Sequence, residues 1–185
     1  MGHILVLGGA RSGKTGVAEG LAMRTGERPA YLATAEALDG EMRERVRTHQ
    51  DQRQGRFATI EVPIEVTAAI VSAARDHDVI LVDCLTLWIS NLLAAGDDVA
   101  QSVEDLATAL LKIEGTRVIL VSNEVGLGIV PDNPLARSFR DLAGAAHQRL
   151  AEICDDVYFV VAGLPMVLKG APGDASPDES RLHEA

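Results

Sequence analysis

The chain has 185 residues, of which 47% are hydrophobic and 24% are charged, a composition typical of one globular domain with a full core. Its formal net charge is −10, with 17 Lys and Arg against 27 Asp and Glu, which argues against a nucleic-acid partner, because such a partner needs a basic surface. No apolar run reaches the roughly 18 residues of a membrane span. No export signal precedes the first apolar run, so we expect a cytoplasmic protein. Cys84 and Cys154 match no zinc or redox spacing and are expected to be free thiols.

Hydrophobic periodicity and turn residues predict strands alternating with helices along the chain. The expected strands are, in chain order, residues 4–7, 30–34, 59–62, 79–83, 117–122, 156–161 and, at a sheet edge, 165–168. The expected helices are residues 13–25, 38–53, 64–75, 84–94, 99–113 and 134–153. The helix over 64–75 is expected to place Ile64, Ala68 and Val71 on one apolar side.

The first strand leads into the pattern G-x-x-x-x-G-K-T, which runs from Gly8 to Thr15. This spacing is typical of a P-loop, whose backbone N–H groups surround phosphate oxygens while the following helix points its positive end at them. Lys14 is expected to contact the β- and γ-phosphates, and Thr15 is expected to bind Mg²⁺. The position two after Gly8 is Ala10, so the pattern does not fit the G-x-G-x-x-G loop of dinucleotide-binding folds.

Asp83 ends a continuous apolar run over 79–82, of the kind found in buried central strands of parallel sheets. A carboxylate at such a strand end corresponds to the Walker B position, where it holds Mg²⁺ or its water shell. The alternative is an ordinary turn or N-cap residue. With the P-loop upstream, we interpret Thr15 and Asp83 as the metal-binding pair.

The segment 123–131 is an apolar loop with two glycines, which is unusual because loops normally face water. We expect it to pack against another surface, such as another subunit. Asp132, Asn133 and Pro134 mark a helix start, with a capping side chain and a proline at the first helical position. The residues that this helix is expected to bury are Leu135, Phe139, Leu142, Ala146 and Leu150.

The order of elements predicts a mostly parallel sheet with helices on both faces, the three-layer P-loop NTPase fold of the RecA-like type. Residues 1–169 are expected to form this one domain. From residue 170 to residue 185, Gly, Ala, Pro, Ser and acidic residues dominate, which predicts a disordered acidic tail without a catalytic role.

Several stretches occur in an order that is more specific than the P-loop alone, which many NTPases share. They are Gly8–Thr15, Tyr31–Thr34, Asp39-x-Glu41-Met42, Arg45-Val46-x-x-His49, Asp83 with Asn91-Leu92-Leu93, and Asn123–Pro131 with Leu135-Ala136-Arg137. Together they resemble the bifunctional adenosylcobinamide kinase / adenosylcobinamide-phosphate guanylyltransferase family of cobalamin biosynthesis. The resemblance covers roughly residues 3–165.

The resemblance implies two reactions. The first phosphorylates the aminopropanol hydroxyl of adenosylcobinamide with ATP or GTP. The second transfers GMP from GTP to that phosphate through a guanylylated histidine, giving adenosyl-GDP-cobinamide and pyrophosphate. His49 matches that histidine, and a neutral imidazole is a competent nucleophile toward a phosphorus atom. Its position on an apolar helical stripe would by itself favour a packing role.

The resemblance also implies the residues of the site, with His49 and Lys14 as catalytic residues. The P-loop contributes Gly8, Gly9, Ala10, Arg11, Ser12, Gly13, Lys14 and Thr15 to nucleotide binding. The further nucleotide contacts are Thr34, Ala35, Glu36, Gln50, Asp51, Gln52, Arg53, Glu61 and Asp83. Glu61 is expected at the guanine edge and Arg53 near the transferring phosphate. Mg²⁺ is the implied cofactor, a corrinoid is the substrate, and the implied assembly is a homotrimer.

Two other interpretations remain open on the sequence. One is an ordinary P-loop kinase or NTPase with a small-molecule acceptor, in which His49 only packs. The other is a non-catalytic nucleotide-binding module that senses GTP and orders a partner-binding surface.

Overall fold

The computed structural model describes residues 2–35 and 55–170. Within these residues seven strands form one sheet, in the order β3-β2-β4-β5-β1-β6-β7. Every neighbouring pair is parallel except β6 and β7, which are antiparallel. The strands are β1 (Ile4–Gly8), β2 (Pro29–Ala33), β3 (Ala58–Glu61), β4 (Val79–Asp83), β5 (Arg117–Asn123), β6 (Asp156–Val161) and β7 (Leu164–Lys169).

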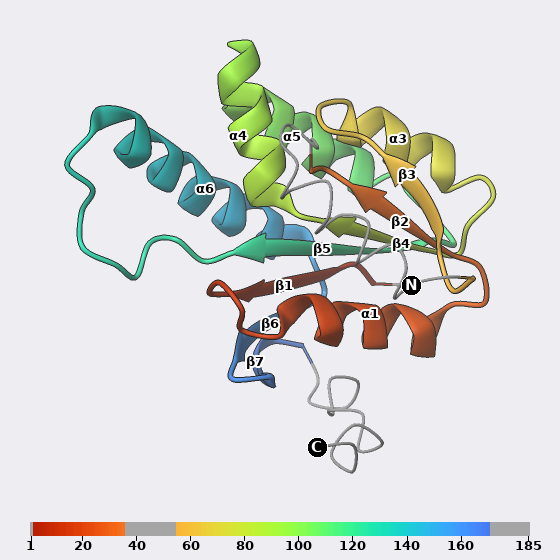
Figure 1. Ribbon diagram of the computed structural model, residues 1–185. Helices are drawn as coiled ribbons and strands as arrows, with labels where there is room; N and C mark the ends of the chain where they lie inside the picture. Colours follow the sequence, from red (N-terminus) through yellow and green to blue (C-terminus); the bar gives the residue numbers. More distant parts are fainter. Residues whose placement is uncertain (1, 36–54, 171–185) are drawn as a thin grey trace.

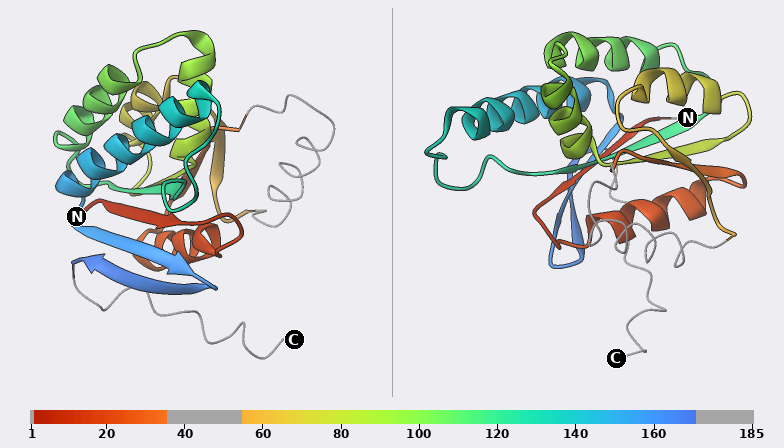
Figure 2. Two further views of the ribbon diagram at one scale, coloured as in Figure 1. Left: turned by 90° about the vertical axis from the view of Figure 1, so that its left-hand side faces the viewer. Right: turned by 45° about the horizontal axis from the view of Figure 1, so that its top comes forward.

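Helices cover both faces of the sheet. Helix α1 (Lys14–Thr25) lies on one face, below the strands in Figure 1. The other face carries α3 (Val66–Ala73), α4 (Leu85–Ala95), α5 (Val99–Leu110) and α6 (Pro134–Ile153), and the two further views in Figure 2 show the same division. This arrangement confirms the predicted mostly parallel sheet between two helical layers.

The central strands explain why the sheet needs both layers. All five residues of β1 are buried, and alternate side chains point to opposite faces. Ile4 and Val6 belong to the core beneath α1, whereas Leu5 and Leu7 belong to the core beneath the other helices. A strand that is apolar on both faces is stable only when both faces are covered.

Helix starts agree with the capping residues in the sequence. The Asn133 side chain accepts a hydrogen bond from the Ala136 N–H at 2.7 Å, and Pro134 opens α6 as expected. The Asp98 side chain caps α5 by accepting from the Gln101 N–H at 3.1 Å. Replacing such a cap by Ala costs about 1 kcal/mol of stability.

The structure corrects one predicted helix start and one predicted buried residue. Helix α3 begins at Val66 rather than at residue 64, and its buried residues are Val66, Ile70 and Ala73, while Ala68 and Val71 face outward. The 3.6-residue period fits either set of residues, and Val66, Ile70 and Ala73 are the ones that belong to the core. Leu135 is 68% exposed rather than buried, because it lies in the first turn of α6, beyond the edge of the sheet.

The remaining expectations concern the cysteines, membrane-spanning helices and two segments of the chain. The two cysteines are free and buried, as predicted. Within the described ranges, no helix is both long and apolar enough to cross a membrane. The predicted helix over 38–53, with His49, lies outside the described residues, and so does the predicted tail beyond Gly170.

Candidate nucleotide-binding site

The P-loop connects the end of β1 to the start of α1, at the edge of the sheet where the parallel strands end. Two of its glycines are required by the geometry. A Cβ on Gly8 would lie 2.6 Å from the Val160 carbonyl oxygen, and Gly13 has a φ of 92°, in the left-handed region that disfavours side chains. The sequence pattern therefore corresponds to the tight turn that a phosphate-binding loop needs.

Two polar side chains of the P-loop are held inside it. Lys14 is 8% exposed and its ammonium group donates to the Gly9 carbonyl oxygen at 3.2 Å. The Ser12 hydroxyl oxygen is buried and has no hydrogen-bond partner among residues 2–35 and 55–170. A buried ammonium group and an unpartnered hydroxyl inside one loop suit a polyanionic ligand such as a triphosphate.

The turn between β6 and β7 supports the P-loop from behind. The Gly163 N–H donates to the Ser12 carbonyl oxygen at 2.8 Å. A Cβ on Gly13 would lie 3.0 Å from the Gly163 Cα, so the two backbones pack closely. This support was not predicted, although the pair Ala162-Gly163 between two short strands is a hairpin-turn signal.

The predicted metal-binding pair is brought together. The Thr15 hydroxyl donates to Asp83 Oδ2 at 2.9 Å, and the Tyr31 hydroxyl donates to the same oxygen at 2.8 Å. Carboxylate and hydroxyl oxygens are ligands that Mg²⁺ prefers, with phosphate and water completing its shell. The described part of the chain has no cluster of three His, Cys, Asp or Glu side chains that could hold a metal ion.

Thr34 is fully buried at the end of β2, and its hydroxyl joins β2 to β4. It donates to the Cys84 carbonyl oxygen and accepts from the Cys84 N–H, both at 2.8 Å. Asn91 of α4 completes the join, because its Nδ2 donates to the carbonyl oxygens of Thr34, at 2.9 Å, and Pro63, at 3.0 Å. Tyr31 and Asn91 thus shape the site without having been predicted as site residues.

Cys84 lies between Asp83 and α4. Burial raises the pKa of its thiol, and the neighbouring Asp83 charge raises it further. The thiol therefore stays protonated at neutral pH and is a poor nucleophile.

Glu61 is far from the phosphate end of the site. It ends β3 in register with Ala33, and β3 is separated from β1 by four strand spacings in the sheet. With about 4.8 Å per spacing, the two strands lie about 19 Å apart. Ala35 follows β2 in the same region, while Glu36, Gln50, Asp51, Gln52 and Arg53 lie outside the described residues.

Polar residues also gather where β5 ends, beside the P-loop. The Glu124 N–H donates to the Gly8 carbonyl oxygen at 3.0 Å, and Asn123 Nδ2 donates to the Thr86 hydroxyl at 2.9 Å. Glu124 Oε1 accepts from the Gly126 N–H. The buried His147 of α6 lies behind Glu124, with Nε2 2.7 Å from the Ser122 hydroxyl and Nδ1 3.9 Å from Glu124 Oε2.

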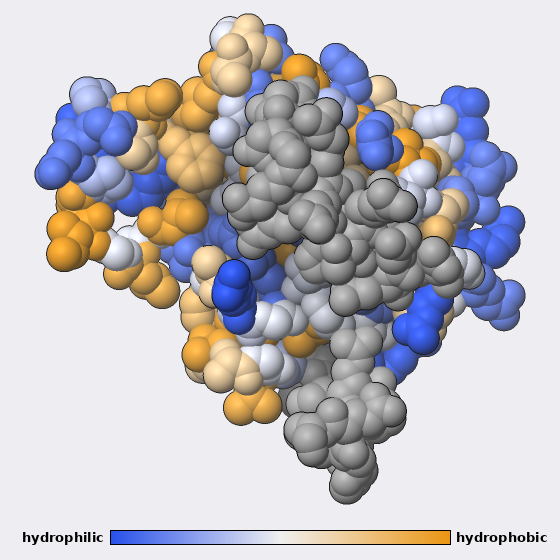
Figure 3. Space-filling model, in the orientation of Figure 1, coloured by the Kyte–Doolittle hydropathy of each residue, from blue (hydrophilic) through white to orange (hydrophobic). Residues whose placement is uncertain are grey.

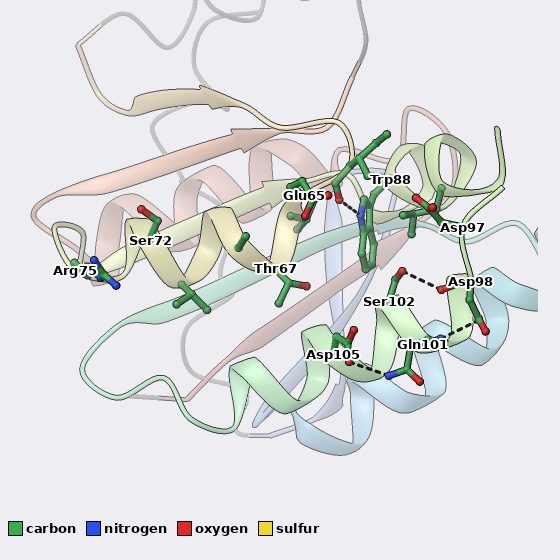
Figure 4. Close-up of a pocket in the computed structure, with 15 residues that line it drawn as sticks. Glu65, Thr67, Ser72, Arg75, Trp88, Asp97, Asp98, Gln101, Ser102 and Asp105 are labelled. Atoms are coloured by element: carbon green, nitrogen blue, oxygen red, sulfur yellow. Dashed lines mark hydrogen bonds between the residues drawn. The ribbon is translucent and has the colours of Figure 1, made fainter. Parts of the chain in front are cut away.

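A groove of about 750 Å³ lies between α3 and α5, with Trp88 at one side (Figure 4). Several of its polar side chains make local hydrogen bonds. Asp98 caps α5, Asp105 Oδ1 accepts from Gln101 Nε2 at 2.9 Å, and Trp88 Nε1 donates to the Ile64 carbonyl oxygen at 2.7 Å. The groove is formed by helices of one layer and contains none of the predicted site residues.

Solved structures similar to this one have the P-loop NTPase fold. The flagellar accessory protein FlaH from Methanocaldococcus jannaschii aligns with a TM-score of 0.54 and 15% identity, over 95% of this chain and 81% of that one. An ATPase from the type III secretion system of pathogenic bacteria aligns with a TM-score of 0.53 and 12% identity, over 90% of this chain and 56% of that one. These similarities confirm the predicted fold class, and at such identities they show the fold alone.

Relatives found by sequence are much more similar to this chain than those solved structures are. The bifunctional adenosylcobalamin biosynthesis protein CobP from Pseudomonas aeruginosa is 48% identical over 171 residues, which are 91% of this chain and 98% of that protein. The bifunctional adenosylcobalamin biosynthesis protein CobU from Salmonella typhimurium is 39% identical over 182 residues, 90% of this chain and 99% of that protein. The family model described as cobinamide kinase / cobinamide phosphate guanyltransferase matches residues 4–168. With its P-loop, its paired Thr15 and Asp83, and this match across nearly all of the domain, the chain belongs to the cobinamide kinase / cobinamide phosphate guanyltransferase family.

Proposed function

We propose that one nucleotide site serves both reactions of this bifunctional enzyme, the phosphorylation of adenosylcobinamide and the transfer of GMP to adenosylcobinamide phosphate. The sequence contains a single G-x-x-x-x-G-K-[ST] pattern, at Gly8–Thr15. One triphosphate held there offers two phosphorus atoms for attack. The observation that carries the proposal is the Thr15–Asp83 contact beside that loop, which makes a complete P-loop and metal pair within the matched domain.

In the kinase reaction the hydroxyl of adenosylcobinamide attacks the γ-phosphorus of ATP or GTP. A P–O bond to the acceptor forms, the bond to the β-phosphate oxygen breaks, and the nucleoside diphosphate leaves. Lys14 neutralises charge on the β- and γ-phosphates, and the P-loop N–H groups orient them. The protein's part is therefore positioning and electrostatic stabilisation of the transferring group.

In the guanylyl reaction a nitrogen of His49 attacks the α-phosphorus of GTP, a P–N bond forms, and pyrophosphate leaves. The phosphate of adenosylcobinamide phosphate then attacks the same phosphorus, and the P–N bond breaks. This covalent route divides one difficult transfer into two easier ones. Its support is the family match, because His49 lies outside the described residues.

Mg²⁺ is the cofactor that we propose for both reactions, held by the Thr15 hydroxyl and the Asp83 carboxylate. When bound, the ion neutralises phosphate charge and orients the β- and γ-phosphates. Tyr31 keeps Asp83 in place through the 2.8 Å hydrogen bond to Oδ2. The remaining nucleotide contacts that we propose are at Thr34, Ala35, Glu36, Gln50, Asp51, Gln52, Arg53 and Glu61, with Glu61 at the guanine.

We also propose a homotrimer whose subunits meet at the apolar loop over 124–130. Figure 3 shows apolar side chains gathered where this loop projects from the sheet, and Leu127, Ile129 and Val130 are 81%, 97% and 57% exposed. Arg137 fixes the end of the loop, because its Nη1 donates to the carbonyl oxygens of Pro131 and Asp132. An exposed apolar patch on an ordered loop favours an interface between protein surfaces. Free buried thiols suit the reducing cytoplasm, where we place the enzyme.

The test uses GTP labelled at the α-phosphate. The protein is incubated with the labelled GTP and Mg²⁺, denatured, and examined for label that survives alkali and is lost in acid, as expected for a phosphoramidate. We expect such label in the wild type and none in His49→Ala. Adding adenosylcobinamide phosphate should move the label to the corrinoid. Label that is undiminished in His49→Ala would contradict the covalent route.

A further inference from the structure

We propose that Glu124 is the general base of the kinase reaction, the group that takes the proton of the acceptor hydroxyl. This inference rests on the proposed function, because it concerns one of its two reactions. Phosphoryl transfer to a hydroxyl releases one proton, and kinases place a carboxylate where the hydroxyl approaches. The position and surroundings of Glu124 meet that requirement.

Position is the first reason. Within residues 2–35 and 55–170, Glu61, Asp83 and Glu124 are the carboxylates at or directly after a strand end on the nucleotide edge of the sheet. Glu61 lies on the outermost strand β3, four strand spacings from β1. Asp83 Oδ2 already accepts from Thr15 and Tyr31, in the metal pair. Glu124 follows β5, the direct neighbour of β1, and its N–H is bonded to Gly8, the first residue of the P-loop.

The second reason is that the two carboxylate oxygens of Glu124 have different surroundings. Oε1 accepts from the Gly126 N–H, which fixes the side chain. Oε2 makes no hydrogen bond within the described residues, and the nearest basic group, His147 Nδ1, is 3.9 Å away, too far for one. The side chain is 21% exposed, so Oε2 can meet an acceptor that arrives from solvent. One anchored and one available oxygen are what a general base requires.

His147 is a positioning residue in this scheme. It is buried, and its Nε2 lies 2.7 Å from the Ser122 hydroxyl, which fixes the ring behind Glu124. Burial lowers the pKa of His147, against the opposing effect of the Glu124 charge. A neutral ring forms no ion pair with the Glu124 carboxyl group, which lies 3.9 Å from it.

The kinase step needs no reactant beyond the acceptor, the triphosphate and Glu124. The acceptor oxygen forms its bond to the γ-phosphorus as its proton passes to Glu124 Oε2, and the diphosphate leaves with the electrons of the broken P–O bond. Glu124 then returns the proton to solvent. The guanylyl reaction needs no such base, because a neutral histidine attacks in one half and an ionised phosphate in the other.

This difference between the two reactions gives the test. In Glu124→Gln the amide oxygen still accepts from Gly126, so the loop keeps its anchor while the base is lost. We expect kcat of the kinase reaction to fall about 10²- to 10⁴-fold. Labelling by α-labelled GTP, and GMP transfer to adenosylcobinamide phosphate, should stay within about threefold of the wild type. Glu124→Asp should recover part of the kinase rate.

The guanylyl reaction also reports whether the variant is folded, since it uses the same P-loop. Kinase activity within about threefold of the wild type in Glu124→Gln would overturn the proposal. An equal loss of both reactions would also overturn it, because it would make Glu124 a structural residue of the site. A wild-type protein that forms the GMP adduct but never phosphorylates adenosylcobinamide would contradict the proposed function itself.

Discussion

The P-loop and the loop over 124–130 follow neighbouring parallel strands at the same level, because Gly8 is in register with Asn123. The two loops differ in how far their side chains are exposed to solvent. The P-loop is packed against the β6–β7 turn and keeps Lys14 buried. The other loop exposes Ile129 almost completely. The first has the packing that suits a small anion, and the second is where we propose that subunits meet. A similar position in a fold therefore does not determine the kind of ligand.

The largest effect is expected from Lys14→Ala, which removes the P-loop cation. Both the kinase and guanylyl reactions should fall by about 10²- to 10³-fold or more, because both use the triphosphate held by this residue. The measurements are kcat/KM with adenosylcobinamide and the rate of labelling by α-labelled GTP. Lys112→Ala is the matched control, since Lys112 is an exposed lysine after α5, and it should leave both rates unchanged. A guanylyl reaction that survives in Lys14→Ala would contradict a shared site, because it would mean that GTP binds elsewhere for that reaction.

A pair of glycine substitutions compares the two loops directly. Gly8→Ala should lower the free energy of unfolding by about 1–3 kcal/mol, because its Cβ would lie 2.6 Å from the Val160 carbonyl oxygen. Gly128→Ala should change it by less than about 0.5 kcal/mol, since a Cβ there meets nothing within 4 Å. Urea unfolding of both variants measures the difference. Equal changes would mean that the P-loop is less tightly packed than its contacts indicate.

The exposed loop is tested by Ile129→Asp. Ile129 is 97% exposed, so the substitution should change the free energy of unfolding of the monomer by less than about 0.5 kcal/mol. It should nevertheless shift the protein from trimer to monomer in sedimentation analysis. Leu111→Asp, on an exposed residue away from the loop, should remain assembled. A trimer that persists in Ile129→Asp would place the interface elsewhere.

The smallest effect concerns the pH dependence of stability. Burial lowers the pKa of His147 in the folded protein, so the unfolded chain binds a proton at this site more readily than the folded one. The corresponding stability is complete above the ordinary histidine pKa of about 6.5 and is lost as the pH falls below it toward the folded pKa. Comparing urea unfolding at pH 7.5 and pH 5.5 should show a smaller loss in His147→Gln than in the wild type.

The sequence predicted those features that depend on local pattern. Continuous apolar runs identified the central strands, and the P-loop spacing with Asp83 identified two parts of the site that the structure brings within 2.9 Å. The spacing of apolar residues in α3 did not show which of them the fold buries, and these are Val66, Ile70 and Ala73. Tyr31 and Asn91 were missed because their roles depend on hydrogen bonds between segments more than 25 residues apart.

The central claim is that one P-loop serves both reactions, and competition between nucleotides tests it most directly. A non-hydrolysable ATP analogue should inhibit the kinase reaction competitively with ATP. It should block formation of the GMP adduct from α-labelled GTP completely, with an inhibition constant that agrees within about twofold between the two assays. Adduct formation that continues when the analogue saturates the kinase would contradict the claim, because it would require a second nucleotide site.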